Sequence, residues 1–215
     1  MSNNNHEYEN PAVTVDMLVF TIEDEQLKCL MVKRKEEPYA GMWSLPGVFV
    51  HIDETLEEAA LRGIREETNL SGIYFEQLYT FSDIHRDPRK RVISVAYMAL
   101  VPREKLTFCT GERTESVSLI HVNNLPEKLA FDHKKIIEYA RNRIKNKVEY
   151  TDIAFHFVSE EFTLPYLQKV YEILLGKALY KANFRKKIIT YIEETGESTA
   201  GDAHRPSKLY RRKKS

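Results

Sequence analysis

The sequence predicts an α+β protein of two domains, and three observations support that prediction. Between residues 12 and 147, apolar segments of strand length alternate with two segments of helical periodicity, as in a mixed sheet covered by helices. After residue 153 two amphipathic helices precede a basic segment that contains glycine. The formal net charge is zero, but residues 177–215 carry seven lysines and four arginines against three glutamates and one aspartate, a net charge of +7. This asymmetry favours a C-terminal domain that binds a polyanion, although a solvated basic tail has the same composition.

The composition is that of a globular chain. Its 215 residues are 42% hydrophobic and 11% aromatic, which is enough to build a substantial core. No apolar run approaches the roughly 18 residues that suggest a membrane span. Residues 1–11 are polar, lack the pattern of a signal peptide and are expected to form a disordered lead. Because the two cysteines, Cys29 and Cys109, form no CxxC motif, we expect a cytoplasmic protein. Because no long apolar run occurs, we expect no membrane association.

The first domain is expected to span residues 12–147. An acidic turn separates its first two strands, and its first helix begins with the pattern Thr55-x-x-Glu58, a capping box in which each side chain can satisfy the other residue's backbone N–H. A polar, charge-rich loop at 82–90 joins two later strands. The expected strands are 12–23, 27–35, 43–50, 73–81, 91–101 and 116–122, and the expected helices are 55–68 and 132–147.

The second domain is expected to span residues 153–215. Thr163 is a suitable N-cap for a helix with Pro165 in its first turn, and Gly176 ends that helix. A second helix is expected at about 181–193, followed by a hairpin-like segment that ends near Tyr210. The apolar residues expected to be buried by the second helix are Phe184, Ile188, Ile189 and Ile192. Two helices joined by a short turn and followed by a basic hairpin have the layout of a winged helix-turn-helix.

An acidic motif lies between Gly47 and Leu70. It reads GVFVHIDETLEEAALRGIREETNL and resembles the Nudix box, whose pattern is G-x5-E-x7-R-E-U-x-E-E-x-G-U with U aliphatic. The positions that match the conserved acidic, basic and aliphatic places of the pattern are Glu54, Arg62, Ile64, Glu66, Glu67 and Leu70. Three positions depart from it: Val48 and Asn69 replace glycines, and Gly63 replaces the glutamate that follows the arginine.

The departure at Gly63 affects the chemistry of the box. Positions 63, 66 and 67 have the spacing i, i+3, i+4, so their side chains share one helix face, where three carboxylates would hold Mg²⁺ and activate a water. The resemblance implies that the residue at the position of Gly63 is important for metal binding and catalysis. We therefore expect vestigial residues at Glu54, Arg62, Glu66 and Glu67, no catalytic residue, and no required cofactor. The alternatives are a residual Mg²⁺ site at Glu66 and Glu67, or carboxylates on an ordinary solvated surface.

Segments outside the acidic motif indicate a particular subfamily of Nudix proteins. Lys33-Arg34 precedes Trp43–Gly47, and residues 83–97 read DIHRDPRKRVISVAY. These segments resemble the Nudix-related transcriptional regulators of NAD metabolism (NrtR type) and of arabinose metabolism (AraR type). The resemblance implies a ligand in the Nudix pocket, which is ADP-ribose or a related nucleotide for the first type and a sugar for the second. We expect Arg86 and Arg91 to clamp phosphates and Phe49 to stack on a base or sugar; the alternative is ion pairs of the loop arginines with Asp83 and Asp87.

The C-terminal region resembles the DNA-binding domain of the same regulators, through FTLPYLQKVYEILLGKALYKANFRKKI at residues 162–188 and Arg205–Tyr210 at the wing. Its second helix keeps an apolar stripe on one side and polar, cationic residues on the other. The residues expected to read base edges or neighbouring phosphates are Lys181, Asn183, Arg185, Lys186 and Lys187. The residues expected to contact phosphates from the wing are Arg205, Lys208, Arg211 and Arg212. The alternative is a solvated helix face with a basic tail.

Taken together, these features predict a Nudix-type αβα sandwich followed by a winged helix-turn-helix. We expect a ligand-responsive transcriptional regulator, a repressor by the example of its relatives, that controls genes of NAD or sugar metabolism. It should bind double-stranded operator DNA as a homodimer, since two-fold symmetry doubles the contact with a palindrome. The alternative function is an active Nudix hydrolase of compounds similar to ADP-ribose, which would require Mg²⁺.

Overall fold

The structure is a computed structural model, and it describes residues 10–68, 72–108, 110, 112–199 and 206–213, without the side chain of Glu67. The expected disordered lead at 1–11 lies outside the described residues, except for positions 10 and 11. None of the described helices is long and apolar enough to cross a membrane.

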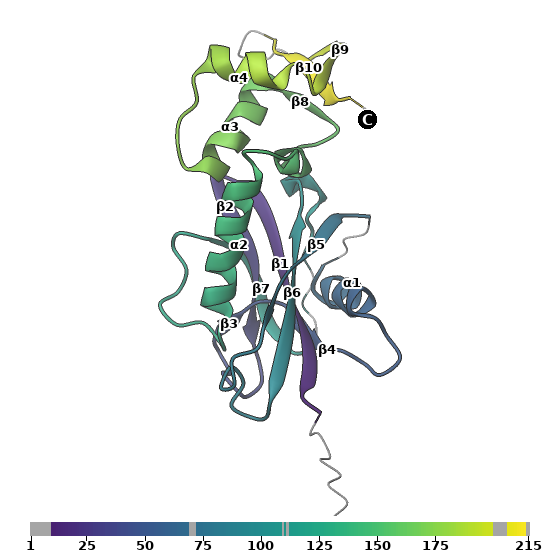
Figure 1. Ribbon diagram of the computed structural model, residues 1–215, viewed down its shortest axis with the longest axis vertical. Coiled ribbons are helices and arrows are strands. Elements are labelled where there is room, and N and C mark those ends of the chain that lie inside the picture. The colour runs from purple at the N-terminus through teal and green to yellow at the C-terminus, as the bar shows by residue number, and fades with distance from the viewer. Residues whose placement is uncertain (1–9, 69–71, 109, 111, 200–205, 214–215) are drawn as a thin grey trace, which may run out of the picture.

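The N-terminal part is a mixed sheet with one helix on each face (Figure 1). Its elements are β1 (Ala12–Glu23), β2 (Gln26–Arg34), β3 (Trp43–Ser44), β4 (Gly47–Phe49), α1 (Leu56–Glu67), β5 (Tyr74–Phe81), β6 (Val92–Leu100), the 3-10 helix η1 (Arg103–Lys105), β7 (Thr114–His121) and α2 (His133–Lys147). The strand order is β3-β2-β1-β6-β5, with β4 paired to β1 and β7 paired to β2. The pair β1–β6 is parallel, whereas β1–β2, β1–β4 and β5–β6 are antiparallel. The predicted αβα sandwich is confirmed.

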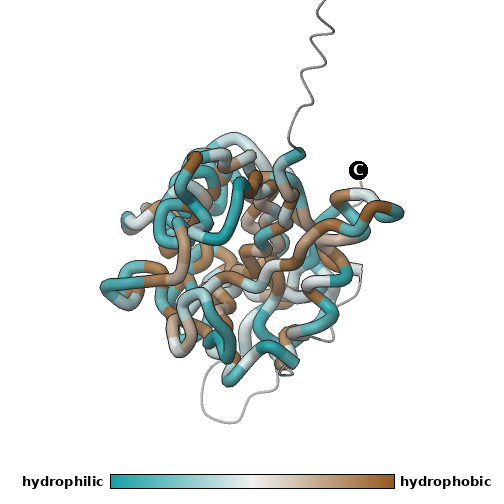
Figure 2. The backbone as a smooth tube through the Cα atoms, turned by 90° about the horizontal axis from the view of Figure 1, so that it is seen from below, coloured by the Kyte–Doolittle hydropathy of each residue, from teal (hydrophilic) through white to brown (hydrophobic). Residues whose placement is uncertain are grey.

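The central strand β1 is apolar on both sides because both faces of the sheet are covered. Side chains alternate along a strand, so Val15, Met17 and Val19 join the cluster that contains α1. The intervening residues Leu18 and Phe20 join the cluster that contains α2. This two-sided burial explains the nearly continuous hydrophobic run in the sequence. Seen along the long axis, hydrophobic segments gather in the middle of the molecule and hydrophilic ones at its outer loops (Figure 2).

The C-terminal part has the expected layout of a winged helix. Its elements are η2 (Ile153–Phe157), β8 (Glu161–Thr163), α3 (Leu164–Leu175), α4 (Lys181–Ile188), β9 (Ile192–Ser198) and β10 (Lys208–Arg212). The strands form a sheet in the order β8-β10-β9. Thr163 caps α3 through its side chain, and Gly176 ends α3 in the left-handed conformation with φ of 69°, both as predicted.

The second helix of this domain is shorter than predicted. It ends at Ile188 instead of near residue 193, because Ile192 already begins strand β9. Phe184, Ile188 and Ile192 are buried as expected, but Ile189 is 50% exposed, so its expected burial is wrong. The run of isoleucines satisfies helical spacing, and only the pairing of β9 with β10 shows where the helix must stop.

The two parts share one hydrophobic core. Residues of β1, β6 and α2 belong to the same buried cluster as residues of η2, α3 and α4. At the junction the rings of Tyr74 and His156 stack with centroids 4.0 Å apart, and Lys169 of α3 pairs with Glu25 at 2.8 Å. Two cavities of about 240 Å³ each also lie at this junction. The winged helix part is therefore packed against the N-terminal part, at the C-terminal end of α2 (Figure 1).

Candidate functional site

The acidic motif forms a clamp at the start of α1. Thr55 caps the helix as predicted: its Oγ1 accepts from the N–H of Glu58 at 3.2 Å, and the Glu58 carboxylate accepts from the N–H of Thr55 at 2.8 Å. Arg62, two turns further on, donates to both oxygens of Glu54 at 2.6 and 3.1 Å and to the carbonyl oxygen of Phe49 at 2.9 Å. The arginine thus ties the loop before α1 to the helix.

Both carboxylates beside Arg62, those of Glu54 and Glu66, accept hydrogen bonds from it. The hydrogen bonds from Arg62, helped by the backbone N–H of His51, lower the pKa of Glu54 to about 2. Glu66 accepts from Nη1 of Arg62 at 3.2 Å. A carboxylate held as Glu54 is keeps its negative charge at every physiological pH. Glu54, Arg62 and Glu66 therefore have a structural part in the fold whether or not a ligand binds.

The motif does not fit the divalent metal that the Nudix resemblance implies. Gly63 is buried in the middle of α1 and offers no oxygen. Within the part of the chain that the structure describes, no three carboxylate, histidine or cysteine side chains gather in a geometry suited to a metal ion. The side chain of Glu67 lies outside the described residues. We accordingly derive no catalytic step from this helix.

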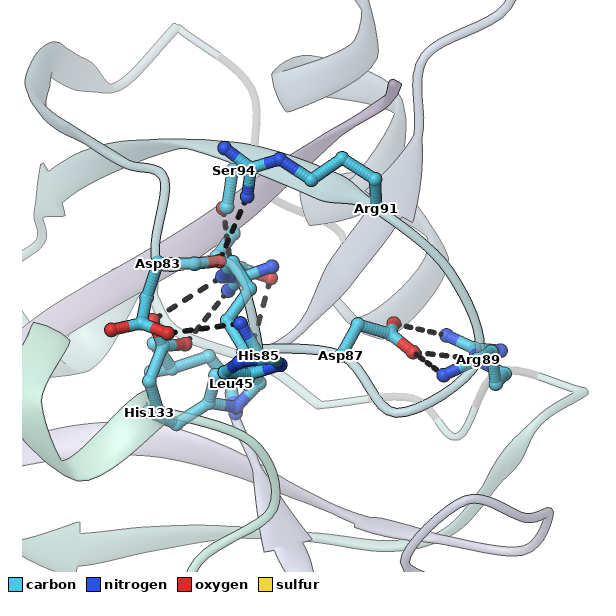
Figure 3. Close-up of polar contacts among 11 residues, drawn as sticks. Leu45, Asp83, His85, Asp87, Arg89, Arg91, Ser94 and His133 are labelled. Atoms are coloured by element: carbon cyan, nitrogen blue, oxygen red, sulfur yellow. Dashed lines mark hydrogen bonds and ion pairs between the residues drawn. The ribbon is translucent and has the colours of Figure 1, made fainter. Parts of the chain in front are cut away.

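A second site is a buried polar cluster, which we define as Asp16, Arg86, Ser94, Asp132 and His133 (Figure 3). Arg86 donates to Asp16 at 2.9 Å and, with two nitrogens, to Asp132 at 2.8 and 3.2 Å. Ser94 donates to Asp16 at 2.5 Å. His133 accepts from the backbone N–H of Leu45 at 2.8 Å through Nδ1. The cluster joins β1, β6, the loop after β5 and the start of α2.

The cluster corrects the role expected for Arg86. Its side chain is only 3% exposed, and two aspartates from distant elements occupy its donors, so it presents no surface to a ligand in this arrangement. The alternative partners expected for it, Asp83 and Asp87, do not pair with its guanidinium either. Asp132 is the N-cap residue of α2 but caps no backbone N–H with its side chain, which is turned to Arg86 instead.

The other loop residues lie closer to solvent. Arg89 pairs with the buried Asp87 at 2.8 Å, which is the kind of ion pair that the alternative interpretation expected (Figure 3). Arg91, an expected phosphate contact, is exposed and donates to the carbonyl oxygens of Ser82 and Asp83 at 3.0 and 2.9 Å. These bonds hold the two ends of the loop together, while the position of Arg91 at the surface stays compatible with a ligand contact.

Phe49, the third expected ligand contact, belongs to an aromatic–cation cluster, which we define as Arg34, Tyr39, Phe49, Arg89, Lys90 and Phe131. Lys90 lies 4.8 Å and Arg89 5.6 Å from the centre of the Phe49 ring. Arg89 and Arg34 also lie over Phe131, at 6.0 and 5.1 Å. Cations and aromatic faces from β2, β4, the loop at 82–90 and the segment just before α2 thus meet at one place.

The cluster also holds two strained residues. Tyr39 has φ of 67° and Phe131 has φ of 54°, values that large side chains rarely adopt, and their rings meet edge to face at 4.9 Å. Backbone strain of this kind persists only where the surrounding structure holds the residue in place, and it is found most often at binding and active sites. The sequence analysis quoted the segments that contain Arg34 and Lys90 but named neither as a ligand contact, and it did not single out Tyr39 or Phe131. These four residues are far apart in the chain, and only the fold brings them together.

The basic surface of the second domain centres on α4. All five of its predicted contact residues are exposed: Lys181, Asn183, Arg185, Lys186 and Lys187. Lys187 donates to the carbonyl oxygen of Glu149 at 3.2 Å, and no ion pair joins Lys181, Arg185 or Lys186 to another described residue. The buried Phe184 and Ile188 fix the helix to the domain. The cationic face of α4 is therefore free to meet a polyanion.

The wing is less available than expected. Lys208 pairs with Glu194 at 2.6 Å, Arg211 pairs with Glu193 at 2.7 Å, and Arg212 pairs with Asp152. Arg205 lies outside the described residues. Sequence reasoning counted the positive charges of β10 but could not see that β9 places carboxylates beside them. A phosphate that approaches the wing must compete with these exposed pairs.

Comparison with known proteins identifies both parts. Residues 12–140 match the NUDIX domain and residues 154–212 match the NrtR DNA-binding winged helix domain. The "ADPR responsive transcriptional repressor NtrR" of Acinetobacter baylyi is 36% identical over 95% of this chain and 83% of its own length. The "ADP-ribose pyrophosphatase" of Methanocaldococcus jannaschii is 41% identical over 61% of this chain and 73% of its own length.

Solved structures agree. NrtR of Shewanella oneidensis, crystallised with a 27mer DNA, has a TM-score of 0.83 and 37% identity, over 94% of this chain and 93% of that chain. Its NUDIX domain, solved with ADP ribose, has a TM-score of 0.57 and 37% identity over 63% of this chain and 90% of that chain. The family expected from the sequence is confirmed: this chain belongs to the NrtR family, in which a NUDIX domain is joined to a DNA-binding winged helix domain.

Proposed function

We propose that this chain is a transcriptional repressor that binds operator DNA through α4 and the β9–β10 wing and responds to ADP-ribose in its NUDIX domain. The observation that carries the proposal is the similarity to an ADPR-responsive repressor over 95% of this chain, both domains included. The genes it controls are expected to serve NAD metabolism. A sugar effector, the other ligand that the sequence left open, has no support among the relatives described above.

The exposed cations of α4 support the DNA-binding part. Arg185 can form two hydrogen bonds with a guanine edge, and Asn183 can do the same with adenine. Lys181 and Lys186 carry charge without a rigid donor geometry, so they suit phosphate contacts that position the helix. Lys208, Arg211 and Arg212 of the wing can add phosphate contacts once their carboxylate partners are displaced.

The aromatic–cation cluster supports the effector part. ADP-ribose carries two linked phosphates, an adenine ring and two riboses, so its site needs cations close to aromatic faces. The cluster offers both: Arg34, Arg89 and Lys90 for the diphosphate, and Phe49 and Phe131 for a ring. Arg91, exposed beside this loop, is a further candidate for a phosphate contact.

Further properties follow from this proposal. A homodimer would let two winged helices contact two half-sites, which gives more specific contact than one domain provides. The protein would act in the cytoplasm, and repression would need no cofactor. The buried polar cluster holds the start of α2, and α2 ends at the junction with the winged helix domain. A change in the loop at 82–90, which carries Arg86, can therefore reach the DNA-binding surface through α2.

The second candidate function is hydrolysis of ADP-ribose. The 41% identity to an ADP-ribose pyrophosphatase favours it, whereas Gly63 in place of a carboxylate opposes it. Because catalysis depends on a few site residues and not on overall similarity, we place repression first. Slow hydrolysis beside repression would require Mg²⁺.

The test is DNA binding measured by fluorescence anisotropy. Fragments selected from the genome by the purified full-length protein serve as probes, over a range of salt concentrations. We expect the logarithm of the affinity to fall linearly with the logarithm of salt concentration, as counterions are released from neutralised phosphates. Addition of ADP-ribose should release the DNA, whereas arabinose should not. Absence of salt-dependent binding to every fragment, with and without ADP-ribose, would overturn the proposal.

Incubation with ADP-ribose and Mg²⁺, followed by chromatography, tests the second candidate separately. Turnover at the rates usual for enzymes, on the order of 1 s⁻¹ or faster, would move hydrolysis to first place. Release of DNA by arabinose and not by ADP-ribose would keep the repressor but change its effector.

A further inference from the structure

The place of the missing carboxylate is not empty space. A Cβ atom added to Gly63 would lie 3.3 Å from each of the two methyl groups of Val48 and 3.9 Å from its Cβ. Contacts of 3.3 Å are tighter than ordinary van der Waals contact between carbons, so the neighbour must give way. Val48 lies on β4, directly opposite Val15 of β1, and so its backbone is fixed by the sheet.

Val48 is half-buried and packs against the apolar cluster between α1 and the sheet. The described members of that cluster on α1 are Ala59, Ala60 and Ile64, which flank Gly63 in the sequence. Valine is branched at Cβ and has a strongly preferred side-chain rotamer, so it cannot fold aside as a long side chain can. Its two methyl groups therefore point at the helix where the side chain of residue 63 would emerge.

Val48 and Gly63 reverse the order of side-chain sizes found in the motif that the sequence resembles. That motif has glycine at the position of Val48 and glutamate at the position of Gly63. In this chain the small residue is on the helix and the large one is on the strand. The neighbouring Gly47 does not take over the role of the first glycine of the motif, because it has a different function. A Cβ atom at position 47 would lie 2.5 Å from Oδ1 of the buried Asp16, so Gly47 leaves room for that aspartate.

We propose that Val48 fills the volume that a carboxylate at position 63 needs, so that position 63 cannot supply a ligand to a divalent metal unless both residues change. Two methyl groups occupy the space in which the side chain of a glutamate at position 63 would begin, and they offer no oxygen to Mg²⁺ or Mn²⁺. Position 63 thus lacks a carboxylate and is also closed to one by an apolar contact. Val48 is a positioning residue of this face and touches no substrate.

The test uses Mn²⁺ alone as the probe, with the full-length protein. Gly63→Glu, Val48→Gly and the double variant Val48→Gly/Gly63→Glu are titrated with Mn²⁺, and free Mn²⁺ is measured by electron paramagnetic resonance. Thermal unfolding of each variant is recorded in parallel. We expect Gly63→Glu to bind Mn²⁺ no better than wild type and to unfold at a lower temperature, because the added side chain meets Val48.

The double variant is expected to lose less unfolding temperature than the two single variants lose together, because the glutamate no longer meets the valine. It should bind Mn²⁺ about tenfold more tightly than wild type, or better, since an added carboxylate ligand raises affinity for a hard cation. Val48→Gly controls for the loss of the valine and should bind like wild type. Equal Mn²⁺ affinity of Gly63→Glu and the double variant would overturn the proposal, as would a double variant that binds no better than Val48→Gly.

A double-mutant cycle with alanine at positions 48 and 63 tests the same contact with smaller changes, in case the larger variants fail to fold. Alanine normally stabilises a helix interior relative to glycine. We expect Gly63→Ala to raise the unfolding temperature less in the presence of Val48 than in the background of Val48→Ala, because only Val48 opposes the new methyl group. The same effect of Gly63→Ala in both backgrounds would overturn the proposed contact. These measurements involve neither DNA nor ADP-ribose, so failure here is distinguishable from failure of the repressor proposal.

Discussion

Arg86 and Arg211 are both arginines paired with carboxylates, yet they differ in surroundings. Arg86 is 3% exposed and shares two aspartates with the start of α2 and with β1. Arg211 is 60% exposed and faces Glu193 on the neighbouring strand of the wing. A buried charge cannot return to water when its partner is lost, whereas an exposed one can. The difference shows which arginine maintains the fold and which can exchange its partner for a phosphate.

The same contrast separates the two halves of the molecule. In the first domain the charges are turned inward, around Arg86 and around Arg62, where they join loops to helices. In the second domain the cations of α4 point outward and pair with no carboxylate among the described residues, whereas the cations of the wing pair with exposed carboxylates. Four predictions test this contrast, in decreasing order of expected effect.

The largest effect is expected at Arg86. Arg86→Met removes the positive charge but keeps similar volume, leaving Asp16 and Asp132 buried without a cation. We expect a loss of about 3–5 kcal/mol in the free energy of unfolding, measured by urea denaturation. The matched control is Arg211→Met, which should cost about 0–1 kcal/mol. Similar costs for the two variants would contradict the distinction between them.

The next effect concerns DNA affinity. Arg185→Ala removes an exposed side chain that can read a base, and we expect it to weaken binding to a selected fragment by about 1–3 kcal/mol, with relaxed preference at one base pair. Lys186→Ala removes a phosphate contact and should weaken binding to all fragments alike, with a shallower dependence on salt. Competition binding with single-base variants of the fragment distinguishes the two. If Arg185→Ala bound the selected fragment as tightly as wild type, Arg185 of α4 would not contact a base.

The third effect depends on pH. Burial lowers the pKa of His133, although the negative charges of Asp16 and Asp132 oppose that change. The unfolded chain, with a histidine pKa near 6.5, then binds a proton before the folded chain does. The stability that this group contributes is complete above about pH 6.5. It is lost as the pH falls from there towards the lowered pKa of the folded chain, with a slope of at most about 1.4 kcal/mol per pH unit.

Asparagine can replace the Nδ1 acceptor that the N–H of Leu45 needs, so His133→Asn keeps the hydrogen bond and removes the titration. Urea denaturation of both proteins between about pH 7.5 and 5, on either side of the unfolded histidine pKa, should show a smaller loss for the variant. His156, whose pKa burial also lowers, is present in both proteins and cancels in the comparison. Parallel pH curves would exclude His133 as the cause.

The smallest effect is expected at the wing. Glu193→Gln releases Arg211 from its exposed pair, so a phosphate no longer competes with a carboxylate. We expect tighter DNA binding by about 0.2–1 kcal/mol and almost unchanged stability, measured by anisotropy and thermal unfolding. Glu197→Gln, at an exposed position of the same strand and outside the ion pairs of the wing, controls for the general loss of negative charge. An equal gain from both variants would mean that only net charge matters.

Similarity of sequence and competence of a site are separate properties in this chain. Its NUDIX domain is more identical to an ADP-ribose pyrophosphatase than the whole chain is to the repressor, 41% against 36%. Both functions need the same NUDIX fold, so identity of this size does not distinguish them. The contact between Val48 and Gly63 concerns only two residues, and by our proposal a change at both would alter what the helix can bind.

Local patterns in the sequence determined much of this structure. The capping box at Thr55, the N-cap at Thr163 and the stop at Gly176 depend on neighbouring residues only, and each lies where it was predicted. The two-sided burial of β1 and the charge asymmetry of the C-terminal region also follow from composition and spacing. The resemblance to the Nudix box further indicated which carboxylate is missing.

Only the tertiary structure decided the partners of charged side chains. Arg86 meets Asp16 and Asp132, which are 70 and 46 residues away, and the wing cations meet carboxylates on another strand. The end of α4, the aromatic–cation cluster and the contact of Val48 with Gly63 likewise depend on segments brought together by the fold. Periodicity describes which face of an element is apolar, whereas the choice of partner depends on the register and packing of elements distant in the chain.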